Sequence, residues 1–212
     1  MISPRYASLI EERRRGLTAQ LSTVFPNGEG SFLCEIGCGH GHFLTAYATA
    51  NPRITCIGID LIGDRIDRAS RKRDRAGLKN LHFIQAEARL FLEQLPPAVK
   101  VMNFVLLFPD PWPKLRHHKN RLIQTEFLNL AVKHAAPGCR LYFRTDYRPY
   151  FDDAAAAIDW WARLDRPVVV KLDGLAGGSA MLGFTAFGII AFLAFRTPEV
   201  DASVINPFDL AV

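Results

Sequence analysis

Along residues 31–146, short apolar blocks alternate with longer and more polar blocks. The short blocks have the length and composition of buried strands, and the longer ones are typical of helices that end near Pro or Gly. The expected strands are 31–39, 54–61, 81–88, 101–111 and 140–146. The expected helices are 42–52, 63–78, 89–95 and 124–138. Strands that alternate with helices in this way predict an α/β fold, with a mostly parallel sheet and helices on both faces.

The segment from Gly174 to Phe195 departs from this pattern because it contains no charged residue over 22 positions. Its length matches a membrane-spanning helix. However, it contains five glycines, and its strongly apolar part is confined to FGIIAFLAF, residues 187–195. Strand length and β-branched or aromatic composition favour a buried strand that follows a glycine-rich loop. We therefore expect no contact with a membrane.

Length and composition place the chain among single-domain proteins with a sizeable core. It has 212 residues, 49% of them hydrophobic, and four scattered cysteines without CxxC spacing. We expect one domain over 1–212, with an N-terminal extension at 1–29, a ligand-binding core at 30–160 and a C-terminal part at 161–212. The cysteines and the absence of a leader-like start favour the reducing cytoplasm, and the protein is expected to be a monomer or homodimer. The net charge of +5 indicates a polyanionic partner only weakly.

Acidic residues stand at the ends of three successive predicted strands: Glu35, Asp60 and Glu87. Right-handed crossovers place these ends at one edge of the sheet, where α/β proteins bind ligands. Each acid alone is explained as well by a helix cap or a loop carboxylate.

The first acid belongs to a glycine-rich turn, EIGCGHG, with glycines Gly37, Gly39 and Gly41. Dinucleotide enzymes also use such a turn, but Glu35 would repel a pyrophosphate and attract an ammonium group. Asp60, 25 positions later, suits ribose hydroxyls, and Glu87 stands where an adenine would lie. Together the three acids predict a site for S-adenosylmethionine.

The stretch FPDPWPKLRHHKNR, residues 108–121, combines a candidate catalytic acid with a run of basic residues. Asp110 lies between two prolines, which fix the turn around it. Trp112 either packs beneath this loop or stacks on a base, and packing is favoured. The basic run contains Lys114, Arg116, His117, Lys119 and Arg121. A solvated surface would explain these bases, but their position beside Asp110 favours contacts with the phosphates of a nucleic acid.

Three motifs resemble those of the bacterial tRNA (guanine-N7)-methyltransferase family: FPDPWPKLRHHKNR, EIGCGHGHFL and FRTDYRPY. The resemblance covers about residues 30–160 and implies a Rossmann-like class I methyltransferase fold. It also implies S-adenosylmethionine as methyl donor, no metal, and a guanosine in the variable loop of tRNA as acceptor. By motif match, the donor site contains Glu35, Asp60, Glu87 and Asp110, and the substrate contacts include Lys114, Asp146 and Thr185.

The chain departs from the family pattern at several positions. Leu115 and Asn120 replace frequent bases, and TAFG at 185–188 ends in Gly188 where the family has a carboxylate or amide. Two other functions remain open. A small-molecule methyltransferase would share residues 30–90 without needing the basic run, and Gly188 is compatible with an RNA-binding relative of weak activity.

Overall fold

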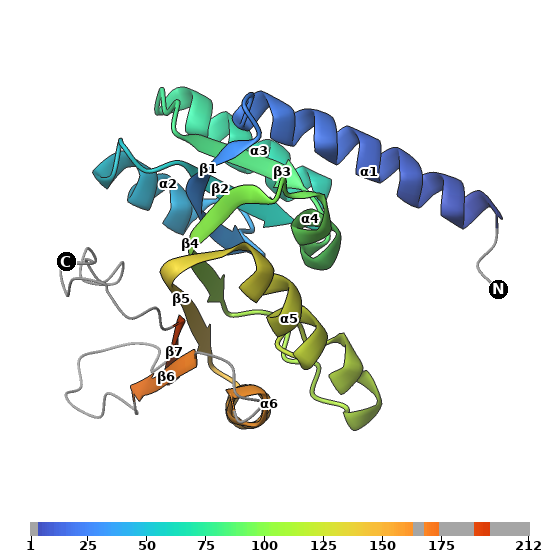
Figure 1. Cartoon of the computed structure of the whole chain (residues 1–212), viewed down its shortest axis with the longest axis vertical. Coiled ribbons are helices and arrows are strands. Elements are labelled where there is room, and N and C mark those ends of the chain that lie inside the picture. The colour runs from blue at the N-terminus through green and yellow to red at the C-terminus, as the bar shows by residue number, and fades with distance from the viewer. Residues whose placement is uncertain (1–3, 163–167, 174–188, 196–212) are drawn as a thin grey trace. The chain divides into compact units, whose positions relative to one another are not determined.

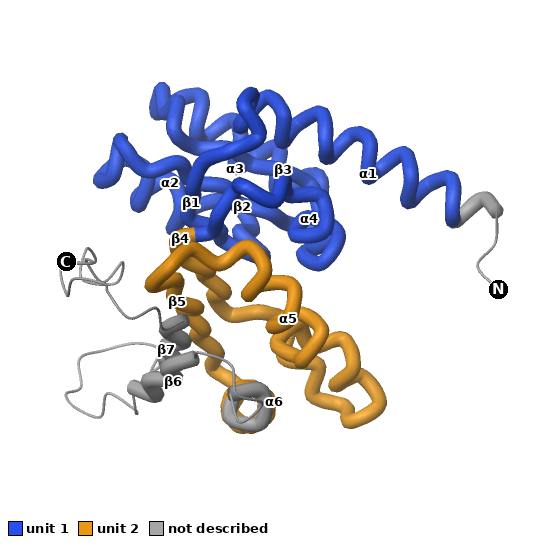
Figure 2. Tube along the Cα trace, in the orientation of Figure 1, with its two compact units in different colours: residues 1–101 blue, residues 102–212 orange. Residues whose placement is uncertain are grey.

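The computed structural model describes residues 4–162, 168–173 and 189–195, with side chains described for 7–158 (Figure 1). Within the chain, two compact units comprise residues 1–101 and 102–212 (Figure 2). The boundary between them falls inside strand β4. The elements of the first unit are α1 (Pro4–Val24), β1 (Glu29–Ile36), α2 (His42–Ala50), β2 (Cys56–Asp60), α3 (Gly63–Arg75), β3 (Leu81–Gln85), α4 (Ala88–Gln94) and the start of β4 (Ala98–Leu107).

The first unit is built on three parallel strands in the order β3-β2-β1. In register, Glu35 pairs with Gly58 and Asp60 pairs with Gln85, so the carboxyl ends of the strands lie at the same edge. Every residue of β2 is buried, as expected for a strand covered on both faces. The core continues through Phe32, whose ring packs edge-on against Phe91 with centroids 6.1 Å apart. This unit confirms the predicted alternation of strands and helices.

Helix α1 was not among the expected elements. Leu17 and Leu21 lie one helical turn apart and are 5% and 1% exposed, so they form its buried stripe. Two contacts tie α1 to α4: Arg14 Nη2 lies 3.2 Å from Glu93 Oε2, and the Thr18 hydroxyl donates to the side chain of Gln94. The N-terminal extension is therefore a packed part of the first unit.

The second unit contains strands in the order β4-β5-β7-β6. Both β5 and β6 pair with β7 in antiparallel register. Phe104, Phe127 and Tyr142 form the centre of its core and are fully buried. The elements are η1, a 3₁₀ helix (Leu115–Asn120), α5 (Thr125–His134), β5 (Ala135–Thr145), α6 (Arg148–Ala162), β6 (Val168–Asp173) and β7 (Ile189–Phe195).

Strand β7 lies within the apolar segment that had raised the question of a membrane helix. Residues 189–195 form a strand between β5 and β6, which agrees with the expected strand at 187–195. Residues 174–188, which include Thr185 and Gly188, lie outside the described part of the chain. Among the helices that the structure describes, none is long and apolar enough to cross a membrane.

Candidate functional site

The glycine-rich turn after β1 is shaped by left-handed backbone conformations. Gly39 has φ +54°, and its N–H donates to Asp60 Oδ2 at 3.0 Å. A Cβ at Gly41 (φ +68°) would come within 2.4 Å of the Phe83 ring and 2.9 Å of the Ala69 methyl. Gly41 therefore lets α2 begin close to β3 and α3. A Cβ at Gly39 would meet no atom within 4 Å. The first N–H groups of α2 receive no side-chain cap from Gly41.

Asp60, the last residue of β2, links the glycine-rich turn to that strand by a hydrogen bond. Its side chain is 6% exposed, and its Oδ1 accepts a hydrogen bond from Ile62 N at 2.9 Å. With the bond from Gly39, each carboxylate oxygen has one backbone donor. Arg65 Nη1 approaches Oδ2 at 3.6 Å from solvent. Because a carboxylate has about four lone-pair sites, Asp60 keeps the capacity to accept further hydroxyl donors.

Glu35 is a buried acid with an unsatisfied oxygen. It is 4% exposed, and its Oε2 has no hydrogen-bond partner among the described residues. Burial and, to a smaller extent, the nearby charge of Asp60 raise the pKa of Glu35 from its ordinary value of 4.5 to about 8. A backbone hydrogen bond from Leu44 acts in the opposite direction. Glu35 and Asp60 are neighbouring buried acids, and Glu35 has one oxygen without a hydrogen-bond partner among the described residues. Together they form a site suited to a cationic group.

A cavity of about 310 Å³ lies beyond the ends of β2 and β3. Leu61, which is 65% exposed, and Ala86 give it apolar walls of the kind that a flat heteroaromatic ring contacts. Gln85 Nε2 donates to the carbonyl of Leu61 at 3.0 Å and fixes that wall. Glu87 also lines the cavity, and its Oε2 caps α4 by accepting from Leu90 N at 2.8 Å.

Sequence reasoning identified Glu87 but missed the rest of this lining. Leu17 and Gln20 of α1 contribute to the cavity, and no motif in the extension had marked them. Leu61 carried a usable signal, since it is an apolar residue directly after the strand-end acid Asp60. In the first unit, the structure thus brings the glycine turn, Glu35 and Asp60 together and places Glu87 at the same sheet edge.

The loop around Asp110 in the second unit is strained at both ends. Phe108 and Trp112 have φ of +49° and +45°, values that cost side-chain-bearing residues about 1–2 kcal/mol each. Phe108 N donates to the carbonyl of Arg144 at 2.7 Å, and the Arg144 guanidinium lies 5.2 Å from the Phe108 ring centroid. Asp110 is exposed between the two strained positions. Such strain persists only where surrounding contacts hold it, and it is frequent at functional sites.

Arg121 is one of those contacts. Although expected to meet a phosphate, it is 3% exposed. Its guanidinium pairs with Asp153, and its Nε donates to the Pro111 carbonyl at 2.9 Å. The guanidinium also lies 4.9 Å from the centroid of the Tyr150 ring. The structure therefore assigns Arg121 to holding the loop rather than to a surface that a polyanion reaches.

The other bases of the run lie on or next to η1. Lys114, Arg116 and Lys119 are exposed. His117 is half-buried, accepts a hydrogen bond from Arg116 Nε at 3.2 Å and packs edge-on against Trp112 with ring centroids 5.7 Å apart. Trp112 thus has a packing partner within the loop.

Asp146 follows β5 and is exposed. Thr145 beside it is buried, and its hydroxyl accepts a hydrogen bond from Tyr147 N at 3.2 Å, which shapes the turn into α6. Thr185, the remaining predicted substrate contact, lies outside the described residues. In the part of the chain that the structure covers, no group of three His, Cys, Asp or Glu side chains could hold a metal ion.

Comparisons with known proteins identify the family and the fold of this chain. A family described as "Putative methyltransferase" matches residues 29–167. The chain is 36% identical over 191 residues to the tRNA (guanine-N(7)-)-methyltransferase of Geobacter metallireducens, covering 87% of this chain and 90% of that protein. It is 30% identical over 192 residues to the protein of the same name from Syntrophotalea carbinolica, covering 89% and 82%.

Among solved structures, the plantazolicin methyltransferase BpumL, in complex with a triazolic desmethylPZN analog and SAH, superposes with a TM-score of 0.59. The match covers 90% of each chain at 14% identity, so it shows the fold alone. The predicted Rossmann-like class I methyltransferase fold is thereby confirmed. From its sequence and its fold, this chain belongs to the tRNA (guanine-N7)-methyltransferase family.

Proposed function

We propose that this protein transfers the methyl group of S-adenosylmethionine to N7 of a guanosine in the variable loop of tRNA. The observation that carries the proposal is the 36% identity to a tRNA (guanine-N(7)-)-methyltransferase over 87% of the chain. The family match over residues 29–167 spans both the glycine-rich turn with its acids and the loop around Asp110. The four cysteines are buried thiols, which is compatible with the proposed cytoplasmic location.

The first unit fits the methyl donor. Glu35 would accept hydrogen bonds from the donor's ammonium group through its unsatisfied Oε2. Asp60 would accept from the ribose hydroxyls, and the cavity at Leu61, Ala86 and Glu87 would hold the adenine. Gly39 keeps the wall beside the turn free of side-chain atoms. When bound, S-adenosylmethionine supplies a methyl group that its sulfonium charge activates for transfer.

The second unit would serve the acceptor. The lone pair of guanine N7 carries no proton, so methylation requires alignment and exclusion of water more than a strong base. Asp110 and Asp146 are the candidate carboxylates for accepting from N1–H and the amino group of the guanine. Either charge would also offset the positive charge that develops on the ring. Asp110 is held by a strained turn, and Arg121 stabilises that turn by donating a hydrogen bond to the carbonyl of Pro111.

Exposed bases beside this turn would position the RNA. Lys114, Arg116 and Lys119 are available to phosphates, and His117 adds a further polar contact. Arg121 contributes indirectly, because its buried guanidinium fixes the segment that carries the others.

A methyl-transfer assay on unmodified tRNA tests the proposal. Purified protein, labelled S-adenosylmethionine and a transcript without modifications should yield 7-methylguanosine after digestion to nucleosides. The matched control is the same transcript with the variable-loop guanosine replaced by adenosine, which should receive no label. Label in another nucleoside, or equal label in both transcripts, would contradict the proposal.

A further inference from the structure

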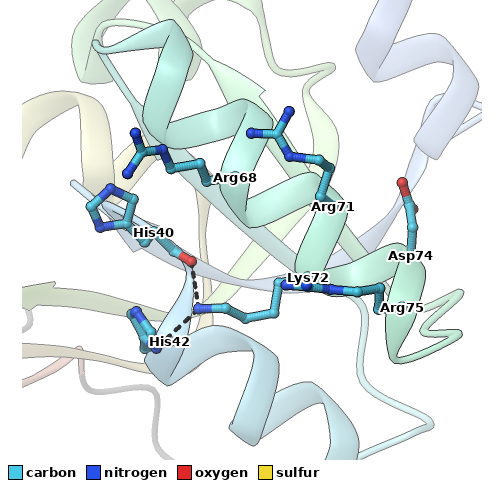
Figure 3. A pocket seen from close by; sticks show the side chains of 7 residues that line it. All are labelled: His40, His42, Arg68, Arg71, Lys72, Asp74 and Arg75. Carbon is cyan, nitrogen blue, oxygen red and sulfur yellow. Dashed lines mark hydrogen bonds between the residues drawn. The ribbon is translucent and has the colours of Figure 1, made fainter.

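A second cluster of basic residues lies in the first unit, on helix α3. Arg68, Arg71, Lys72 and Arg75 recur at i, i+3, i+4 and i+7 and so share one helix face. They line a shallow cavity of about 620 Å³ with His40, His42 and Asp74 (Figure 3). We call these four residues the α3 patch.

No acid among the described side chains forms an ion pair with the α3 patch. Asp74, the acid that lines the cavity, accepts hydrogen bonds from Arg73, with 2.8 Å between Arg73 Nε and Asp74 Oδ1. Within residues 7–158, where side chains are described, none of the four patch cations forms an ion pair. The pKa of Lys72 is lowered by partial burial and by the charge of Arg75, as expected where cations crowd together.

Helix stability does not explain the whole patch. Cations in the last turn interact favourably with the helix dipole, and this accounts for Lys72 and Arg75. Arg68 and Arg71 stand earlier, and their neighbours three or four positions away include both bases and the acids Asp64 and Asp67. Among the described side chains neither arginine forms an ion pair with these acids, so both exposed guanidinium groups are available to a ligand.

We propose that the α3 patch binds the phosphate backbone of the substrate RNA, an inference that rests on the proposed function. From Arg68 to Arg75 the patch extends about 10 Å along the helix axis, at about 1.5 Å per residue. Phosphates repeat along a nucleic-acid strand, so a row of cations of this length is suited to several successive phosphates. A single free phosphate would engage only part of the patch.

Lys72 joins the α3 patch to the glycine-rich turn. Its Nζ donates to the carbonyl of His40 and contacts Nδ1 of His42, both at 2.9 Å (Figure 3). RNA held by the patch would therefore lie next to the turn that we assign to the methyl donor. Because Lys72 supports that turn, it is unsuitable for a test of RNA binding alone.

The test uses the double variant Arg68→Gln/Arg71→Gln in the full chain. Both side chains are exposed and make no described contact with the donor site. The matched control is Arg15→Gln/Arg53→Gln, which removes the same charge from exposed positions on other elements of the first unit. Binding of an unmodified tRNA transcript is measured by fluorescence anisotropy between 0.05 and 0.3 M salt, alongside thermal unfolding and calorimetric titration with S-adenosylmethionine.

The inference predicts a log–log salt slope that is shallower by nearly two for the patch variant. Affinity should fall about fivefold for each lost phosphate contact at 0.15 M salt, hence about 25-fold for both. The melting temperature should change little, since both side chains are exposed and form no ion pair, and donor affinity should be unchanged. The control should remain within about twofold of wild type.

Two results would overturn the inference. If wild type binds and methylates tRNA while the patch variant keeps the slope and affinity of the control, the α3 patch is a solvated surface and the proposed function stands. If wild type itself shows no binding to tRNA, the inference and the proposed function both fail.

Discussion

Donor binding should release a proton from Glu35. Burial and the nearby charge of Asp60 hold the pKa of this carboxyl at about 8, so in the free protein at pH 7 it carries about 0.9 of a proton. An ammonium group placed against Oε2 favours the ionised carboxylate and lowers this pKa well below 7. Binding of S-adenosylmethionine at pH 7 should therefore release close to one proton per site.

Calorimetric titration in buffers of different ionisation enthalpy measures this number directly. Wild type should release about 0.9 proton per donor bound at pH 7, a value that follows from the raised pKa. Glu35→Gln should release none and should bind the donor more weakly. Identical enthalpies for wild type in all buffers would show that Glu35 does not meet the ammonium group.

The same raised pKa predicts how stability depends on pH. Between pH 4.5 and 8 the folded protein keeps a proton on Glu35 that the unfolded chain has lost. Stability of wild type relative to Glu35→Gln should therefore fall as pH rises through this window, by about 1.4 kcal/mol per unit. Urea unfolding at pH 5, 6 and 7 without donor measures the slope. A pH-independent difference between the two proteins would refute the assignment.

Four further substitutions test separate parts of the site. Asp60→Asn should weaken donor binding by about 1.5–3 kcal/mol in calorimetry, because a ribose contact to a charged acceptor is lost, and unchanged affinity would remove Asp60 from the site. Arg121→Ala should lower the free energy of unfolding by about 2–3 kcal/mol in urea titrations, somewhat less than for a fully buried pair because Asp153 is 54% exposed. Lys114→Ala should make the salt slope of tRNA binding shallower by about one at constant stability, and an unaltered slope would show that the lysine meets no phosphate. Asp110→Asn should reduce single-turnover methyl transfer by about 10²–10³ with little change in tRNA affinity, and a normal rate would leave Asp146 as the candidate.

The strands of the first unit could be predicted because their signals are local. Each apolar run ends at a glycine, an acid or a polar turn, and β2 and β3 end within a few residues of the expected positions. Helix α1 also carried a local signal, since Leu17, Leu21 and Phe25 recur every four positions and all three are buried. The polar composition around them concealed that stripe.

Boundaries in the second unit were harder to predict. The sequence predicted a helix that ends at Pro137 and Gly138. In the structure, α5 ends earlier, at His134, and Pro137 and Gly138 belong to β5. Proline is tolerated near the start of a strand, so the dipeptide does not distinguish the two cases.

The role of Arg121 could not be inferred from the sequence, because it depends on a residue far along the chain. Its partner Asp153 stands 32 positions later on α6, and nothing in the basic run distinguishes Arg121 from the exposed Lys119. A buried guanidinium needs a partner elsewhere in the fold, and no local sequence pattern identifies that partner. The same holds for Glu35, whose unsatisfied oxygen becomes apparent only in the folded unit.

Two synthetic tRNAs that differ at one position test whether the methyl group goes to N7 of guanine in the variable loop. One tRNA has guanosine at that position and the other has 7-deazaguanosine. The second base keeps the Watson–Crick edge that Asp110 or Asp146 would contact but has C–H in place of N7. We expect methyl transfer to the first tRNA, none to the second, and similar affinity for both. Equal methyl transfer to both would contradict this expectation.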